Sequence, residues 1–162
     1  MKTWLFIAFS CFFVSVAFAQ DEVPPFKKNR SLPDFELELT DKTLFTKAKM
    51  QKNMPSILMF FSPGCDHCII QTEGMLKRMK DLNKYQILLV TIQPIEELQA
   101  FDKKYQIKKY PNIVTGRDTR YVFPPFYEIQ NFPYLAFYDN QGKLLSTFEG
   151  NMSVDDMLKK FR

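Results

Sequence analysis

Apolar runs of strand length alternate with amphipathic helical patterns along most of the chain. Two of these runs, residues 56–61 (SILMFF) and 86–92 (QILLVTI), are continuous, as in strands that are covered on both faces. From Cys65 to about Leu82 the apolar residues recur at helical spacing, with charges between them. Residues 95–107 repeat this rhythm after Pro94, a residue that favours the start of a helix. The pattern predicts a strand, a helix, a second strand and a second helix.

The C-terminal part predicts a hairpin and a final helix. Residues 134–138 and 143–148 read as two strands joined across the turn sequence DNQG. Ser153, with Asp156 three positions later, has the pattern of a helix N-terminal capping pair. The element order indicates an α/β fold with a central mixed β-sheet flanked by helices. Residues 108–126 contain three prolines and a glycine and are predicted to be an irregular insertion.

The first residues have the pattern of a secretory signal peptide. Lys2 is followed by an uncharged apolar stretch that ends in Ala17-Phe18-Ala19, with acids directly after it. We expect cleavage after Ala19, the alternative being an uncleaved membrane anchor. The chain is then exported, and periplasmic in a Gram-negative cell. Residues 20–31 read as a polar linker, and residues 32–162 as one domain.

Composition favours a folded chain that does not bind nucleic acid, and we expect the protein to act as a monomer. The chain has 162 residues, 17 Phe, 7 Tyr and a net charge of only +4, with basic and acidic residues interspersed. The lysines around positions 103–109 are most simply a solvated helix face, because no dense basic stripe with stacking aromatics accompanies them.

Two cysteines three positions apart are the chain's distinctive chemistry. Of the three Cys, Cys11 lies in the predicted signal peptide, so Cys65 and Cys68 form the whole thiol inventory of the mature protein. A pair at the start of a helix lies where free backbone N–H groups favour a thiolate. Cys65 is then the nucleophile and Cys68 the resolving thiol. Of the residues between them, His67 favours the thiolate electrostatically and Asp66 opposes it.

Two other roles for the pair are weaker. A disulfide that closes so short a loop removes little entropy from the unfolded chain, which makes it a poor structural staple. A metal centre needs more ligands than one CxxC and the single histidine His67, so neither a metal nor another cofactor is expected.

The segment FFSPGCDHC (residues 60–68) resembles the active-site segment of thioredoxin-like proteins, and its CxHC form is similar to that of disulfide oxidases and isomerases. SLPDFELELTDK (residues 31–42) is similar to the strand that precedes the core in the TlpA/ResA and peroxiredoxin branch, which implies an N-terminal β extension. The SPxCxxC pattern looks most like exported proteins of this type from Bacteroidota. A peroxidase is not expected, since Leu58 and Ser62 stand where that pattern has Pro and Thr.

Residues 127–150 are similar to the thioredoxin segment from the cis-proline loop through the last hairpin. The resemblance implies that Pro133 is the cis-proline. It also implies a groove for an extended substrate strand, with Phe132 and Tyr134 on one rim and Pro63 and Gly64 on the other.

The chain departs from the thioredoxin pattern at two positions. Gly64 replaces the Trp before the first Cys, and Met59 replaces the buried acid that takes the proton of the resolving thiol. Glu128 is one possible substitute for that acid.

The sequence thus predicts an exported thiol-disulfide oxidoreductase that acts on protein disulfides. We expect it to work as a reductase that a membrane thiol donor reduces again after each turnover. Three alternatives stay open: an oxidase or isomerase, which His67 favours; a binding module without turnover; and a metal-delivery protein.

Overall fold

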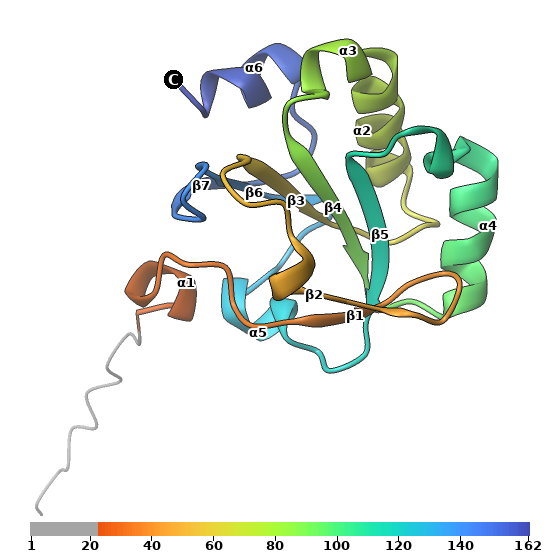
Figure 1. Cartoon of the computed structure of the whole chain (residues 1–162), viewed down its shortest axis with the longest axis horizontal. Helices are drawn as coiled ribbons and strands as arrows, with labels where there is room; N and C mark the ends of the chain where they lie inside the picture. The colour runs from red at the N-terminus through yellow and green to blue at the C-terminus, as the bar shows by residue number, and fades with distance from the viewer. Residues whose placement is uncertain (1–22) are drawn as a thin grey trace, which may run out of the picture.

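The structure is a computed structural model, and it describes residues 23–162. Within these residues a mixed sheet has the strand order β2-β1-β5-β4-β3-β6-β7 (Figure 1). The strands are β1 (Glu36–Glu38), β2 (Leu44–Thr46), β3 (Ser56–Phe60), β4 (Gln86–Thr91), β5 (Ile113–Asp118), β6 (Tyr134–Tyr138) and β7 (Leu144–Glu149). The helices are α1 (Pro25–Lys28), α2 (Asp66–Lys77), α3 (Met79–Leu82), α4 (Ile95–Tyr105), α5 (Phe123–Tyr127) and α6 (Val154–Lys159), with short 3-10 turns at η1 (Lys47–Lys49) and η2 (Ile107–Lys109).

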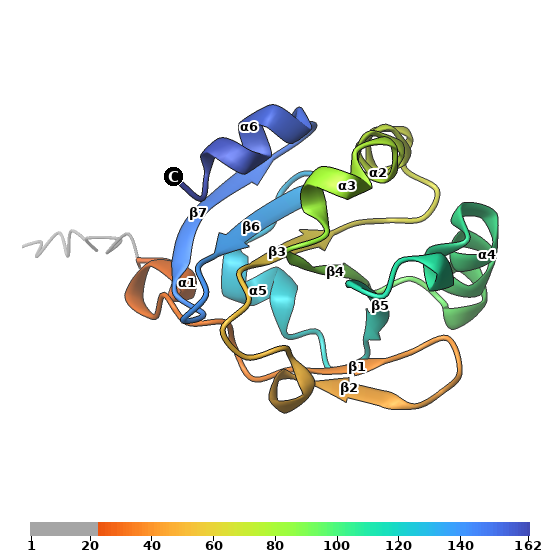
Figure 2. The same ribbon diagram turned by 45° about the horizontal axis from the view of Figure 1, so that its top comes forward.

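Strand β3 occupies the centre of the sheet, parallel to β4 and antiparallel to β6. All five of its residues are buried, as its continuous apolar sequence predicts. Ile57 and Met59 join a core with residues of α2, α4 and α6, whereas Leu58 and Phe60 join a second core with residues of α5, β1 and β2. Figure 2 shows α2, α3 and α6 on one side of the sheet and α5 on the other. The sheet is therefore covered on both faces.

The predicted fold class is confirmed: an α/β thioredoxin-like fold with a mixed sheet flanked by helices. The predicted N-terminal β extension is the hairpin of β1 and β2, which adds to the edge of β5 through antiparallel pairing. Ser153 caps α6 by accepting a hydrogen bond from the Asp156 backbone N–H, as the sequence predicts. The long helix expected from Cys65 to Leu82 is instead two helices, because the backbone leaves the helical conformation at Arg78.

The structure corrects the irregular insertion predicted for residues 108–126, because this segment contains β5 and α5. Strand β5 pairs in parallel with β4 along its length. Its sequence IVTGRD hides this, because two of its buried side chains are polar and hydrogen-bonded. Thr115 donates to Asp102 (2.7 Å), and Asp118 accepts from the Phe123 backbone N–H (2.9 Å). Such internal partners allow polar residues in a core strand.

The polar linker predicted for residues 20–31 also differs from the structure, since from Pro25 onward the chain packs on the domain. The Phe26 ring lies 5.9 Å from that of Tyr127, and Ser31 forms a β-bridge with Lys143. The Arg30 guanidinium donates to the Leu144 carbonyl oxygen, which orders the segment. The predicted signal peptide (residues 1–19) lies outside the described residues. From residue 23 onward the chain has no helix both long and apolar enough to cross a membrane.

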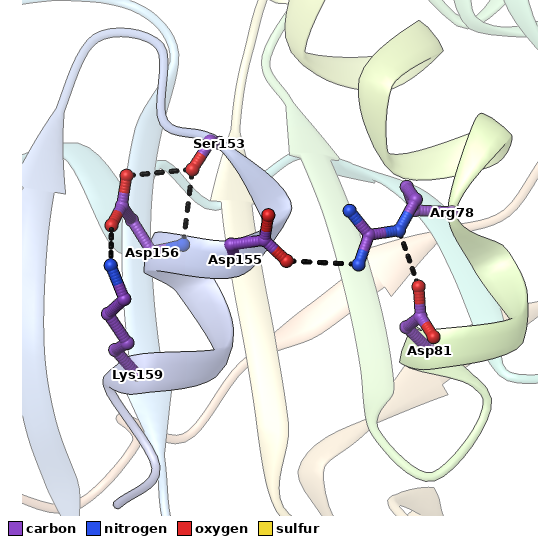
Figure 3. A network of polar contacts seen from close by, with 6 residues as sticks. All are labelled: Arg78, Asp81, Ser153, Asp155, Asp156 and Lys159. Atoms are coloured by element: carbon purple, nitrogen blue, oxygen red, sulfur yellow. Dashed lines mark hydrogen bonds and ion pairs between the residues drawn. The ribbon is translucent and has the colours of Figure 1, made fainter.

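A network of charged side chains links the break between α2 and α3 to helix α6 (Figure 3). The Arg78 guanidinium donates to Asp81 and, at 3.0 Å, to Asp155. On α6 itself, Asp156 accepts from Ser153 and from Lys159, both at 2.7 Å. These groups are solvent-exposed, so each pair adds little to stability on its own. Within this set, the pair of Arg78 and Asp155 joins the start of α6 to the end of α2.

Gly116 tests how closely β1 packs on β5. A Cβ atom at Gly116 would lie 2.6 Å from the Leu37 Cβ, whereas one at Gly74 on α2 would meet nothing within 4 Å. We expect Gly116→Ala to lower the free energy of unfolding by about 1–3 kcal/mol through overpacking. Gly74→Ala is the matched control and should raise it by about 0.5–1 kcal/mol through helix propensity. Urea unfolding measures both, and equal effects would contradict the close approach of the two strands.

Candidate active site

Cys65 lies at the point where the chain leaves strand β3 and enters helix α2. The Cys65 backbone N–H donates to the Ser62 carbonyl oxygen (3.1 Å), which closes the turn between strand and helix. Cys65 is the N-cap of α2, and its Sγ accepts a hydrogen bond from the Cys68 backbone N–H at 3.3 Å. A cap that accepts such a bond satisfies one of the free N–H groups of the first turn. The same geometry favours negative charge on the Cys65 sulfur.

Cys68 lies one turn further along α2 and differs from Cys65 in its surroundings. Its side chain is fully buried, with 0% exposure, whereas Cys65 is half-buried, and no disulfide joins the two sulfurs. Burial, and secondarily the neighbouring Cys65 sulfur, raise the pKa of the Cys68 thiol to about 12. The first cysteine is thus accessible and the second is held as a neutral thiol behind it.

The two residues between the cysteines are both exposed, and His67 forms hydrogen bonds with a distant part of the chain. Asp66 is the first residue of α2 and supplies an acidic side chain to its first turn. The His67 ring and backbone both bind the side chain of Asn151, a residue of the loop between β7 and α6. Sequence reasoning missed Asn151, because it lies 84 positions from His67 and has no local motif.

The peptide bond between Phe132 and Pro133 is cis, as the resemblance implied. The Pro133 carbonyl accepts a hydrogen bond from the Gly150 N–H (2.8 Å), and the next residue, Asn151, binds His67. The cis-proline loop and the CxxC turn therefore meet through two consecutive residues. The Phe132 side chain is 36% exposed.

The other predicted rim carries Pro63, which is half-buried, and Gly64, which is exposed. A Cβ atom at Gly64 would meet nothing within 4 Å, so this rim is open.

Tyr134 does not fit the predicted groove rim. Its side chain is only 3% exposed and belongs to the core on the α5 side of the sheet, opposite helix α2. Its ring lies 5.3 Å from that of Tyr127, and burial raises the pKa of its hydroxyl. The alternation of side chains along a strand places residue 134 on the face away from the cysteines. Tyr134 can contribute to this groove only through its backbone.

A buried acid on β3 is absent, as the sequence indicates: Met59 is fully buried and apolar. Glu128, the substitute considered from the sequence, is exposed and follows the end of α5 in a left-handed backbone conformation. The buried polar residues nearest to Cys68 in the chain are Gln71 and Thr72 of α2. Thr72 donates to the Cys68 carbonyl oxygen (2.8 Å), and Gln71 accepts from the Met152 backbone N–H (2.7 Å). Neither can act as a carboxylate base.

The side chains do not assemble a metal centre over residues 23–162. No cluster of three or more His, Cys, Asp or Glu side chains within this range could hold a metal ion.

Fold and site together define a protein of the thioredoxin class. The model of the thioredoxin-like domain family matches residues 42–162, and the chain belongs to this family. No curated protein sequence matches this one significantly.

Solved structures with the same fold include redox proteins, one of them described as secreted and one as an exposed lipoprotein. Mycobacterium tuberculosis DsbF, solved in mixed oxidised and reduced forms, has a TM-score of 0.65 at 20% identity over 78% of this chain and 91% of its own. A secreted disulfide oxidoreductase of the same organism, homologous to E. coli DsbE, has a TM-score of 0.64 at 18% identity. This match covers 78% of this chain and 92% of its own. The exposed lipoprotein thioredoxin Etrx1 of Streptococcus pneumoniae has a TM-score of 0.61 at 24% identity, and the match covers 78% of this chain and 96% of its own. At these identities the likeness establishes the fold.

The contrast between the two cysteines predicts selective alkylation. In the reduced protein at pH 8, iodoacetamide should modify Cys65 first, because the raised pKa and the burial of Cys68 keep its thiol neutral and shielded. Intact-mass and peptide mass spectrometry would follow the two sites. The Cys65→Ser variant is the matched control, in which Cys68 should stay slow until urea unfolds the chain. Equal rates at both sites in the folded protein would contradict this order.

Proposed function

We propose that this protein is an exported thiol-disulfide oxidoreductase that exchanges disulfides with protein substrates, in the direction of a reductase. The observation that carries the proposal is the asymmetry of the CxxC pair. A half-exposed Cys65 caps α2, and a fully buried Cys68 lies one turn behind it with a strongly raised pKa. A nucleophile at the surface and a protected resolving thiol are what a two-step exchange needs.

The exchange uses the pair in sequence. The Cys65 thiolate attacks one sulfur of a substrate disulfide, the substrate bond breaks, and the other substrate sulfur leaves as a thiolate that takes up a proton. Cys68 then loses its proton and attacks the Cys65 sulfur of the mixed disulfide. The second substrate thiol is released, and the Cys65–Cys68 disulfide forms. The substrate is reduced by two electrons and the protein is oxidised by two.

An extended peptide is the proposed substrate, bound beside the cysteine pair. The cis-Pro133 loop, Phe132 and the open Gly64 rim border Cys65 in this proposal. The backbone beside Pro133 would pair with the substrate strand, as in β-strand addition. His67 and Asp66, both exposed in the first turn of α2, would tune the redox poise in opposite directions.

Export and re-reduction complete the proposal. The signal-peptide pattern of residues 1–19 supports export, to the periplasm in a Gram-negative cell, as do the names of two fold neighbours, a secreted protein and an exposed lipoprotein. Outside the cytosol a reductase needs a continuing source of electrons, for which a membrane thiol donor is the simplest class. The protein would act as a monomer of the TlpA/ResA type.

The reduction potential of the Cys65–Cys68 couple tests the proposal. Equilibrating the protein with dithiothreitol or glutathione buffers should give a reduction potential of about −270 mV, as for thioredoxin-like reductases. A value of about −120 to −180 mV would instead assign the oxidase or isomerase direction that His67 favours. If no reversible exchange occurs, the binding-module alternative replaces the redox assignment.

The order of attack predicts a trapped intermediate. Cys68→Ser should accumulate a mixed disulfide between Cys65 and a disulfide-bonded peptide, because the resolving thiol is missing. Cys65→Ser should form none at the same concentration, since Cys68 is buried. Non-reducing electrophoresis and mass spectrometry would detect the adduct, and trapping by Cys65→Ser alone would reverse the assigned roles.

A further inference from the structure

Three successive residues of the loop between β7 and α6 each bind a different part of the site: the cis-proline loop, His67 and helix α2. The Gly150 N–H donates to the Pro133 carbonyl, Asn151 binds His67, and the Met152 N–H donates to the Gln71 side chain at 2.7 Å. Gly150 has a φ of +97°, a conformation that side chains other than glycine rarely adopt. This conformation lets the chain turn from the cis-proline loop toward α2.

Asn151 makes two hydrogen bonds to one residue. Its Nδ2 donates to the His67 backbone carbonyl at 2.6 Å, and its Oδ1 lies 2.9 Å from the His67 Nδ1. The direction of both bonds follows from the groups involved. A backbone carbonyl can only accept, so the amide nitrogen of Asn151 must face it. The amide oxygen is then the atom that faces the imidazole.

This arrangement leaves one protonation pattern for the neutral ring. An amide oxygen can only accept, so His67 Nδ1 must carry a hydrogen to form the 2.9 Å bond. The other ring nitrogen, Nε2, then carries the lone pair. Because Asn151 holds the hydrogen on Nδ1, Nε2 is the nitrogen left free to accept a second proton. His67 is exposed, and Nε2 is the ring nitrogen that Asn151 leaves free.

We propose that Asn151 is a positioning residue that fixes His67 as its Nδ1–H tautomer and makes Nε2 the proton-exchanging atom of the active site. In the exchange reaction, the imidazolium can then give its Nε2 proton to the substrate thiolate that leaves. The neutral Nδ1–H ring that remains regains a proton from solvent. The tautomer stands on the hydrogen bonds alone, whereas its part in the exchange rests on the proposed function.

The single histidine of the chain makes the tautomer directly measurable. The protein, purified without a histidine tag and labelled with ¹⁵N, would be studied by long-range ¹H–¹⁵N correlation NMR. The pH would be raised until the ring signals stop changing, so that the neutral form is observed. We expect a protonated Nδ1 and a bare Nε2 in the wild-type protein.

Two variants of Asn151 separate its two hydrogen bonds. Asn151→Ala removes both, so the ring should shift to the Nε2–H form that free imidazole side chains prefer. Asn151→Asp keeps an acceptor for Nδ1–H but loses the donor to the His67 carbonyl, so it should retain the Nδ1–H form. Asn140→Ala, at an exposed residue of the β6–β7 turn, is the matched control and should leave the spectrum unchanged. A wild-type Nε2–H ring, or an unchanged tautomer in Asn151→Ala, overturns the proposal.

A double-mutant cycle tests whether Asn151 acts through His67 in the exchange reaction. We expect Asn151→Ala to change the rate of disulfide exchange about threefold to tenfold, the effect of one lost hydrogen bond. In a His67→Ala background the same change should have almost no effect. An equal effect in both backgrounds would mean that Asn151 serves only the backbone, and would overturn its role in the reaction. If the wild-type protein shows no exchange, the proposed function fails while the NMR result still decides the tautomer.

Discussion

The burial of strand β3 on both faces is the constraint on which the site depends. Every residue of β3 is buried between β4 and β6, and its side chains alternate between the two cores. A strand fixed in this way has no freedom of register, because a shift by one residue would exchange the two faces. The turn after it therefore delivers Cys65 to one defined place at the start of α2. The position of Cys65 therefore follows from the packing of the core.

The second half of the site comes from the end of the chain and is held by polar contacts. Residues 150–152 bond to the Pro133 carbonyl, to His67 and to Gln71. The contact to Gln71 involves a buried side chain, whereas the pair of His67 and Asn151 is exposed. Exposed hydrogen bonds contribute little to stability because water competes for them. We therefore infer that Gln71 anchors the loop and that Asn151 serves the geometry of the ring.

The sequence predicts the elements that depend on interactions between neighbouring residues. The apolar runs of β3 and β4, the helical rhythm after Cys65 and the Ser153 cap each depend on a few neighbouring residues, and each is found. Strand β5 was missed because Thr115 and Asp118 find their hydrogen-bond partners only in the folded chain. Tyr134 was misplaced because a motif does not say which face of the sheet a side chain joins. Asn151 could not be identified from the sequence, because no local motif links it to His67.

The apolar centre of the sheet also shapes the chemistry of the second step. With Met59 in β3 and Glu128 exposed, neither of these positions supplies a buried carboxylate to take the Cys68 proton. The raised pKa of Cys68 keeps its thiol neutral at neutral pH. Part of that raised pKa comes from the neighbouring Cys65 sulfur, and this part falls away once Cys65 is bonded to a substrate. Formation of the mixed disulfide thus makes Cys68 easier to ionise. In the proposed exchange, this favours the resolving step once the mixed disulfide has formed.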